Sequence, residues 1–312
     1  MPDVGIVSAV SRDQCADPSV VRLLTDTEIQ WRAAGPTSRA VRSFGADATN
    51  LRRLPGGQGN VWSDGRVVLK TVGCVPEHTW VCGVYDSWPA DGDVRVPRPL
   101  RPESRDEEPG WSVDGWGAHL WVEGRDLELP REVAEVRAAS DAFHRHLAGV
   151  PRPAFLDVRH DPWSLGDRIA WEGAEPVGDE ATLALMTPLL QALRPVSDVG
   201  QPVHGDILPN VLVEDGMAPA VIDWPPYFRP VGFANAIAVT DAMTFKGAPL
   251  TLMDDWADGD AWDQLLVRAL IYRFGPTGYF AVHGRLMGSL LTHVERARPV
   301  VDAVLGRLQT EG

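Results

Sequence analysis

The chain has 312 residues, 44% of them hydrophobic, with 43 acidic against 29 basic residues. This length exceeds a comfortable single core and predicts two domains or lobes. The formal net charge of −14 argues against nucleic acid or an anionic membrane surface as a partner, because both are bound through basic surfaces.

No stretch of the sequence reaches the roughly 18 apolar residues of a membrane span, and the N-terminus lacks the basic and apolar regions of a secretory signal. A cytoplasmic location is therefore expected. The three cysteines, Cys15, Cys74 and Cys82, form no C-x-x-C pair. We expect them to be reduced, structural thiols.

The first chemical motif is a glycine-rich turn, residues 55–60, between two short predicted strands. Its glycines, Gly56, Gly57 and Gly59, would let backbone N–H groups approach a bound anion because no Cβ intervenes. A third strand follows this hairpin, whereas a dinucleotide-binding fold would need a helix there. Phosphate binding and a plain hairpin with glycines at positive φ are both open interpretations.

Lys70 ends the third strand, residues 66–70, and is one of only two lysines in the chain. A solvent-facing lysine at a strand end is one interpretation. The glycine turn just upstream favours another, in which the ammonium group pairs with nucleotide phosphates. A carboxylate on the next helix usually orients such a lysine, and Glu77 is the nearest candidate. Glu77 is equally well explained as a first-turn glutamate that the helix dipole favours.

The predicted elements change from mostly strands to mostly helices near residue 123. Residues 111–113 and 116–122 predict one more hairpin before this point. After it, residues 225–230 predict an extended loop, and apolar side chains at 3.6-residue spacing predict helices. These helices are expected at 130–149, 161–171, 179–194, 231–246, 260–273, 277–290 and 291–309.

The central motif is the loop that contains His204, Asp206 and Asn210. Two apolar runs, 211–213 and 220–222, follow it on either side of an acidic turn and predict a β-hairpin. That hairpin would bring Asp206, Asn210 and Asp223 to one edge of a small sheet. Two carboxylates and an amide there can hold Mg²⁺, and a carboxylate can take a proton from a hydroxyl nucleophile. This is the arrangement of a phosphoryl-transfer site.

Together these motifs resemble the aminoglycoside phosphotransferase family, which shares the protein-kinase-like fold. The resemblance covers about residues 50–290 and rests mainly on His204-Gly205-Asp206 with Asn210 and on Ile222-Asp223-Trp224. It implies an α+β, bilobal fold. The N-lobe, residues 1–122, would carry a small antiparallel sheet with a helix, and the larger C-lobe, residues 123–312, would be mostly helical.

The resemblance also implies a role for each motif residue. In the N-lobe, Gly56, Gly57 and Gly59 would cover the triphosphate, Lys70 would contact its phosphates with Glu77 as partner, and Trp121 would lie in the hinge that meets the purine. In the C-lobe, Asp206 would be the catalytic base, and Asn210 and Asp223 would hold the metal. One difference concerns the loop, because three residues separate Asp206 from Asn210 where the family has four.

The function implied is that of a small-molecule kinase. It would transfer the γ-phosphoryl group of ATP or GTP, with Mg²⁺, to a hydroxyl of an antibiotic of the aminoglycoside, peptide or nucleoside type. Trp224, Tyr227 and Phe228 are candidates for stacking on the acceptor. The alternatives are a kinase of an ordinary sugar or metabolite, a nucleotide-binding protein without transfer activity, and a metal hydrolase built on His204, Asp206 and Asp223.

Overall fold

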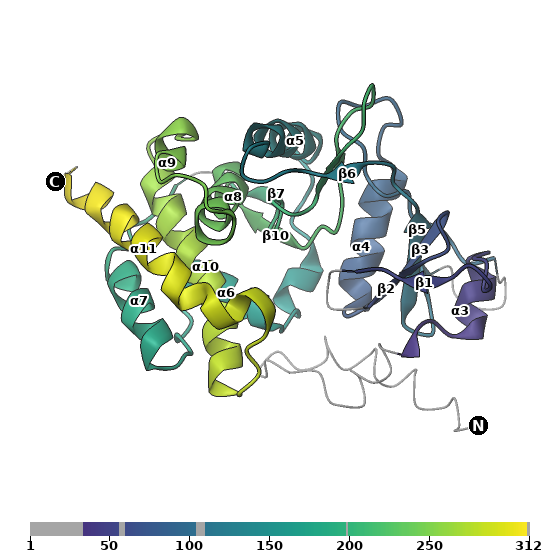
Figure 1. The fold of residues 1–312 in the computed structure, drawn as a ribbon, viewed down its shortest axis with the longest axis horizontal. Helices are drawn as coiled ribbons and strands as arrows, with labels where there is room; N and C mark the ends of the chain where they lie inside the picture. Colours follow the sequence, from purple (N-terminus) through teal and green to yellow (C-terminus); the bar gives the residue numbers. More distant parts are fainter. Residues whose placement is uncertain (1–33, 56–59, 104–109, 198, 311–312) are drawn as a thin grey trace. The chain divides into compact units, whose positions relative to one another are not determined.

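The computed structural model describes residues 34–55, 60–103, 110–197 and 199–310 (Figure 1). The chain divides into two compact units. Unit 1 comprises Met1–Gly124, Pro153–His160 and Glu214–Ala220, and unit 2 comprises Arg125–Arg152, Asp161–Val213 and Val221–Gly312. Gly56, Gly57 and Gly59 lie outside the described residues, so their predicted role is not addressed by the structure.

Unit 1 contains a five-stranded antiparallel sheet with the strand order β1-β2-β3-β5-β4. The central strand β3 pairs with β2 on one side and β5 on the other, so Leu69 faces Trp62 and Ala118 across the sheet. Helix α4, Val75–Asp86, follows β3 and has a proline in its first turn. The strands are β1 (Arg52–Arg53), β2 (Val61–Ser63), β3 (Val67–Thr71), β4 (Ser112–Val113) and β5 (Trp116–Leu120).

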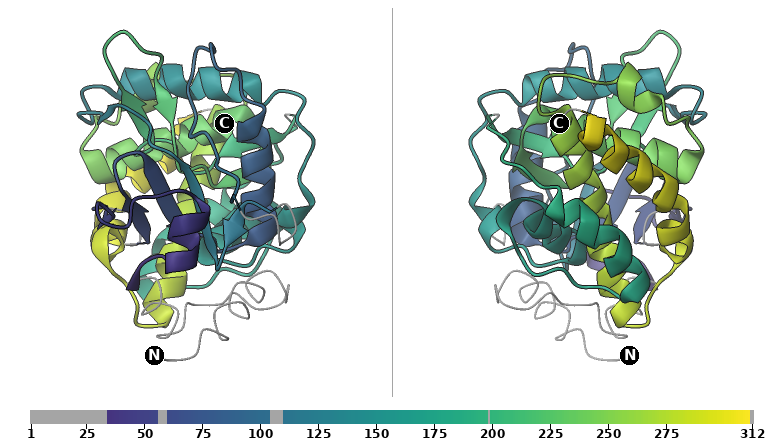
Figure 2. Two further views of the ribbon diagram at one scale, coloured as in Figure 1. Left: turned by 90° about the vertical axis from the view of Figure 1, so that its right-hand side faces the viewer. Right: turned by 90° about the vertical axis from the view of Figure 1, so that its left-hand side faces the viewer.

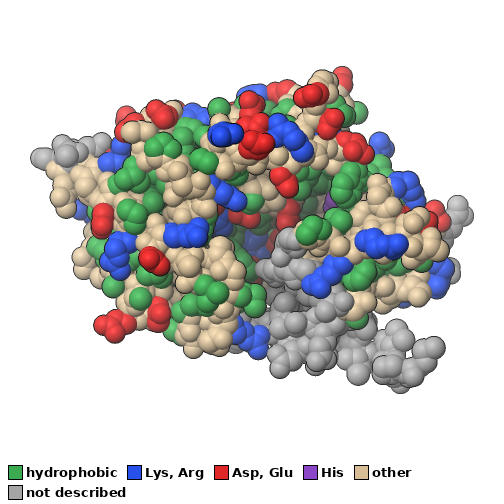
Figure 3. Space-filling view, viewed as in Figure 1, with side chains coloured by type: hydrophobic (Ala, Val, Ile, Leu, Met, Phe, Trp, Pro, Cys, Tyr) green, Lys and Arg blue, Asp and Glu red, His purple; other side chains and the backbone are tan. Residues whose placement is uncertain are grey.

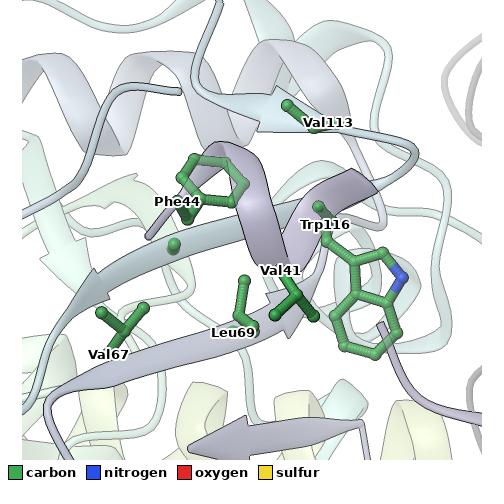
Figure 4. Packing of buried hydrophobic residues seen from close by; sticks show 8 residues of the cluster. Val41, Phe44, Val67, Leu69, Val113 and Trp116 are labelled. Carbon is green, nitrogen blue, oxygen red and sulfur yellow. The ribbon is translucent and has the colours of Figure 1, made fainter. Parts of the chain in front are cut away.

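A short helix, α3 (Ser38–Ser43), covers one face of this sheet and forms the core of unit 1 with it. Figure 4 shows side chains from the helix segment meeting side chains from the strands below it. All of them are at most 5% exposed, so the core is a closed apolar layer. Its labelled members are Val41, Phe44, Val67, Leu69, Val113 and Trp116.

Helix α4 of unit 1 carries two cysteines, one at its N-cap and one in its interior. Cys74 is the N-cap of α4 and is disulfide-bonded, whereas Cys82 is a buried free thiol. Burial raises the pKa of the Cys82 thiol to about 12, so it stays protonated. The expectation of reduced thiols throughout is therefore wrong for Cys74.

Unit 2 is built mainly from helices, and α10 packs against α6, α7, α8 and α11. The C-terminal helix α11, yellow in Figures 1 and 2, lies alongside α10 and also contacts α7 and α8. Acidic and basic side chains are interspersed on the face shown in Figure 3. The helices are α5 (Val133–His146), α6 (Pro162–Glu172), α7 (Glu180–Gln191), α8 (Val231–Lys246), α9 (Leu252–Asp255), α10 (Trp262–Val282) and α11 (His293–Thr310).

Helix α6 begins at a capping residue, Asp161. Asp161 caps α6 by accepting from the backbone of Trp163 and Ser164, and the Ser164 hydroxyl accepts from the Asp161 amide in return. This reciprocal capping box satisfies donors that a helix start leaves open. Among the described helices, none is long and apolar enough to cross a membrane.

Two small sheets complete the strands. β8 (Val211–Val213) lies between β6 (Arg125–Asp126) and β9 (Ala220–Val221), which agrees with the predicted hairpin. A second pair, β7 (Gln201–His204) with β10 (Pro226–Arg229), is antiparallel. The predicted extended loop at 225–230 is therefore a strand, and it fixes the segment that leads into Asp206.

Helix α10 also departs from its prediction, because it runs through Pro276 instead of ending before it. Proline has no N–H to donate to the carbonyl of Tyr272. That carbonyl faces Gly166 of α6, where an added Cβ would lie 2.3 Å from the oxygen. Likewise, a Cβ on Gly275 would lie 2.2 Å from the Cα of Gly166. The two helices thus touch backbone to backbone at a glycine pair.

We expect Gly166→Ala to lower the free energy of unfolding by about 1–3 kcal/mol or more, because the methyl group would force α6 and α10 apart. The matched control is Gly306→Ala in α11, where no heavy atom lies within 4 Å of an added Cβ. The control should be neutral or stabilise by about 0.5–1 kcal/mol. Urea unfolding of both variants measures this, and equal stability of the two would contradict the close contact.

Candidate active site

The loop between β7 and β8 carries the predicted catalytic residue in unit 2. Its first constraint is at Gly205, where an added Cβ would lie 2.4 Å from the ring of Tyr227. The Gly205 amide donates to Pro225 at 3.0 Å, and its carbonyl accepts from the Tyr272 hydroxyl at 3.2 Å. Glycine is therefore required before Asp206, because any side chain would displace the aromatic ring beneath the loop.

His204 joins the two segments that carry the predicted carboxylates. Its Nδ1 accepts from the Asp206 amide at 3.0 Å, and its Nε2–H donates to the Ile222 carbonyl, also at 3.0 Å, next to Asp223. These partners fix a neutral tautomer, since an amide only donates and a carbonyl only accepts. Burial lowers the pKa of His204 to about 4, although the nearby carboxylates of Asp206 and Asp223 oppose this.

A second buried histidine supports the first. His144 of α5 accepts from the His204 amide through Nε2 at 3.1 Å and donates through Nδ1 to the Ser140 carbonyl at 2.7 Å. Burial lowers the pKa of His144 to about 3. Both imidazoles therefore brace the loop in their neutral forms. With both ring nitrogens occupied, His204 cannot ligate a metal, which counts against the metal-hydrolase alternative.

Asp206 presents its carboxylate at the end of this braced segment, with its side chain 40% exposed. Oδ1 accepts from Arg273 Nη2 at 2.6 Å. Oδ2 lies 3.4 Å from the Asn210 amide nitrogen and has no closer partner among the described residues. One carboxylate oxygen is thus held, and the other is available to accept a proton.

Arg273 lies on α10 and is anchored by Asp241 of α8. Its Nε donates to both carboxylate oxygens of Asp241, at 2.9 and 3.1 Å, and its Nη2 makes a further short contact with Oδ2. Burial opposes the charge of Arg273, but the carboxylates of Asp241 and Asp206 outweigh it and raise the pKa of the guanidinium. Burial raises the pKa of Asp241 to about 6, against the pull of Arg273.

Sequence reasoning missed Arg273 and Asp241. The signal available was a charged residue in a mostly buried helix: Asp241 lies among small and apolar residues of α8, and Arg273 is one of three charged residues of α10, with Asp263 and Arg268. A charge in such a place needs a partner of opposite charge. The identity of that partner, however, comes only from the packing of α8 against α10.

Asn210 and Asp223 have the chemistry that Mg²⁺ requires. The Asn210 amide nitrogen donates to the Asp206 carbonyl at 2.6 Å, and its carbonyl oxygen has no partner among the described residues. Asp223 follows β9 with φ of 48° and is exposed. An amide oxygen and a carboxylate suit a hard cation that takes its other ligands from water and phosphate. In the described part of the chain, no cluster of three or more His, Cys, Asp or Glu side chains could hold a metal ion.

In unit 1, Lys70 lies on β3 opposite Gly117 of β5 and is partly buried. The ring of His78 packs over Gly117, where an added Cβ would lie 2.3 Å from it. His78 contacts the Trp111 carbonyl at 3.0 Å, and burial, aided by the charge of Lys70, lowers the pKa of the imidazole. A neutral histidine therefore lies beside the lysine, and sequence reasoning did not anticipate it.

Glu77 accepts from Arg159 Nη1 at 3.1 Å, an ion pair in which the arginine side chain is 7% exposed and the glutamate 23%. Its predicted role toward Lys70 stays a prediction. Trp121 is 38% exposed, and its amide donates to the Arg66 carbonyl at 2.8 Å. Its predicted place in a hinge is likewise untested.

Two of the three aromatic residues predicted to stack on the acceptor are buried in the core. Trp224 is 5% exposed, and its indole N–H donates to the Val203 carbonyl at 3.0 Å. Tyr227 is 2% exposed and packs edge-on against Tyr272. These two side chains support the loop from below, so the expectation that they stack on an acceptor is wrong. Phe228 is partly buried.

We expect the free energy of unfolding to fall as the pH drops from about 6.5 to about 4. His144, His204 and His293 have pKa values lowered to about 3, about 4 and about 3, so the unfolded chain binds these protons first. Each contributes a slope of about 1.4 kcal/mol per pH unit in this range. Asp241, with its pKa raised to about 6, opposes this with one proton bound by the folded state.

Urea unfolding at pH 7.5, 6 and 5 measures this slope. His144→Gln is the informative variant, because it removes one buried imidazole and should reduce the slope by about 1.4 kcal/mol per pH unit. Stability that does not change over this pH range would show that the imidazoles are not held neutral.

The fold defined by these elements is that of the kinase-like aminoglycoside phosphotransferases. A thermostable mutant of aminoglycoside phosphotransferase APH(4)-Ia, in a ternary complex with AMP-PNP and hygromycin B, is 17% identical. The match covers 84% of this chain and 96% of that one, with a TM-score of 0.55. The α+β fold class and the predicted resemblance are thereby confirmed for the fold.

Two other solved structures show the same likeness. Spectinomycin phosphotransferase APH(9)-Ia, in complex with ADP and spectinomycin, is 14% identical over 90% of this chain and 98% of that chain, with a TM-score of 0.52. The GDP complex of aminoglycoside 2'-phosphotransferase-IIIa is 13% identical over 86% and 97%, with a TM-score of 0.53. Neither the family models nor the curated protein sequences contain a match to this chain.

Proposed function

We propose that the protein is a small-molecule kinase that transfers the γ-phosphoryl group of ATP or GTP to a hydroxyl of an antibiotic. The observation that supports this most is the braced loop, which presents an Asp206 carboxylate with one oxygen open beside the Asn210 amide. A fold shared with kinases crystallised with hygromycin B and spectinomycin supports the antibiotic as acceptor.

Each residue has a distinct part in this proposal. Asp206 accepts the proton of the acceptor hydroxyl through Oδ2. The oxygen of that hydroxyl bonds to the γ-phosphorus, and the bond from the γ-phosphorus to the bridging oxygen breaks, so that this oxygen leaves with the nucleoside diphosphate. Lys70 contacts the phosphates, with Glu77 in support, and Gly56, Gly57 and Gly59 cover them.

The metal site of the proposal consists of Asn210 and Asp223, and Trp121 lies in the hinge beside the purine. When bound, Mg²⁺ would neutralise charge on the phosphate oxygens. Asn210 additionally holds the loop through the Asp206 carbonyl, so its amide has both a structural role and a ligand role.

The proposed partners are a nucleoside triphosphate and a small hydroxylated acceptor, without nucleic acid or membrane, in the cytoplasm. An aminoglycoside, peptide or nucleoside antibiotic fits the acceptor class, and its phosphorylation would give resistance. The formal charge of −14 is compatible with a cationic acceptor of this kind. An ordinary sugar or metabolite is the alternative acceptor.

A screen of hydroxylated antibiotics and sugars, with ATP and GTP in parallel, tests the proposal. The expected result is a mass gain of one phosphoryl group on at least one antibiotic, dependent on Mg²⁺ and absent without nucleotide. Transfer only to a sugar would favour the metabolite kinase. Tight nucleotide binding without transfer to any acceptor would overturn the proposal in favour of a nucleotide-binding protein.

A further inference from the structure

Two successive residues of α10 hold the loop of Asp206. The Tyr272 hydroxyl donates to the Gly205 carbonyl, and the Arg273 guanidinium donates to the Asp206 carboxylate. Arg273 is 11% exposed at its side chain, and its partner Asp241 only 7%. Arg273 is therefore a buried cation inside unit 2. Of its two carboxylate partners, Asp241 is buried and Asp206 is partly exposed.

We propose that Arg273, held by Asp241, is a positioning residue that sets the orientation of the Asp206 carboxylate for phosphoryl transfer. This inference rests on the proposed function. The acid itself is 40% exposed, so nothing in its own burial would fix its side-chain rotamer. The ion pair at 2.6 Å occupies Oδ1 and turns Oδ2 toward Asn210.

Because Asp241 holds Arg273, the ion pair between Arg273 and Asp206 differs from an ordinary surface ion pair. A surface arginine loses side-chain entropy when it pairs, and the pair fluctuates. Here the guanidinium plane is already set by contacts from Nε and Nη2 to the Asp241 carboxylate. Because a misplacement of about 1 Å can cost roughly 100-fold in rate, a fixed donor at Oδ1 matters most for turnover.

The decisive variant replaces both buried charges, Arg273→Met with Asp241→Asn, so that no unpaired charge remains in the core. Arg273→Lys is the conservative variant, since it keeps the charge but cannot form the same two-sided contact. The control is Arg307→Met, which breaks ion pairs to Asp263 of α10 and Asp254 of α9 without touching the loop.

The probe is Mg²⁺ and ATP with water as acceptor, followed by any acceptor that the screen identifies. The double variant should lose at least about tenfold in kcat with little change in KM for ATP. The kcat of Arg273→Lys should lie between those of the double variant and the wild type. Arg307→Met should keep wild-type kcat. A folded double variant with wild-type kcat would overturn the inference and leave Arg273 a structural role only.

Crystal structures of wild type and the double variant supply a readout that needs no activity. The Asp206 carboxylate should leave its wild-type rotamer in the variant, and an unchanged rotamer would overturn the inference. Wild-type protein that transfers nothing to water or to any acceptor would instead contradict the proposed function. The two failures are thus distinguishable.

Discussion

Replacing Asp206 with asparagine should lower the turnover of phosphoryl transfer by about 10²- to 10⁴-fold, the range that a general base contributes. Asparagine has the same shape and keeps one oxygen that can accept from Arg273. It cannot take the proton of an acceptor hydroxyl. The loop should remain folded, because His204 and Asn210 brace it through the backbone amide and carbonyl of residue 206, and the asparagine oxygen can still accept from Arg273.

The measurement is the steady-state rate of phosphoryl transfer to the acceptor found in the screen, beside nucleotide affinity by calorimetry. Affinity should change little. Asp215→Asn is the control, since Asp215 is an exposed carboxylate in the turn after β8 and lies outside the proposed site. Turnover near the wild-type value in Asp206→Asn would contradict the assignment of the base.

The local parts of this fold follow from short-range sequence signals. The hairpin of β8 and β9 is predicted by two apolar runs around an acidic turn ending in Gly216, which has φ of 75°. Helix α6 begins where the helix at 161–171 is expected, with Asp161 as its N-cap. In these places the chemistry of three or four neighbouring residues decides the structure, so a pattern in the sequence is sufficient.

The parts that prediction missed depend on contacts between distant segments. Pro225 and Pro226 indicate an extended loop, yet β10 pairs with β7 because a two-stranded sheet tolerates proline at its edges. Pro276 normally ends a helix, but α10 continues through it, since Gly166 and Gly275 let α6 pack against the proline-containing turn. Neither partner can be inferred from the local sequence.

In the candidate site too, residues close in sequence could be predicted, and a residue distant in sequence could not. His204 ends β7, and Asp206 and Asn210 lie in the loop that follows it, so their mutual hydrogen bonds could be anticipated even with one residue fewer between Asp206 and Asn210 than the family has. Arg273 lies 67 residues from Asp206 in sequence, and only the packing of α10 beneath the loop brings it there. The predicted base was visible in the sequence, but the group that holds it was not.

Replacing Asp223 with asparagine should remove the Mg²⁺ dependence of nucleotide binding. Asp223 has φ of 48°, a left-handed conformation that asparagine adopts more readily than most residues, so this variant should keep the backbone. Alanine would add backbone strain and confuse the result. The substitution removes the negative charge that would hold a cation and keeps the size of the side chain.

Calorimetric titration with ATP, with Mg²⁺ and then with EDTA, measures the effect. In the wild type, we expect Mg²⁺ to strengthen binding by at least about tenfold, or about 1.4 kcal/mol, and this gain should vanish in the variant. Unchanged urea unfolding of the variant is the control, since His204 donates to the Ile222 carbonyl and not to the Asp223 side chain. If Mg²⁺ still strengthened binding as much, the metal ligand would have to be sought elsewhere, and Asn210 alone is too weak a ligand set to supply it.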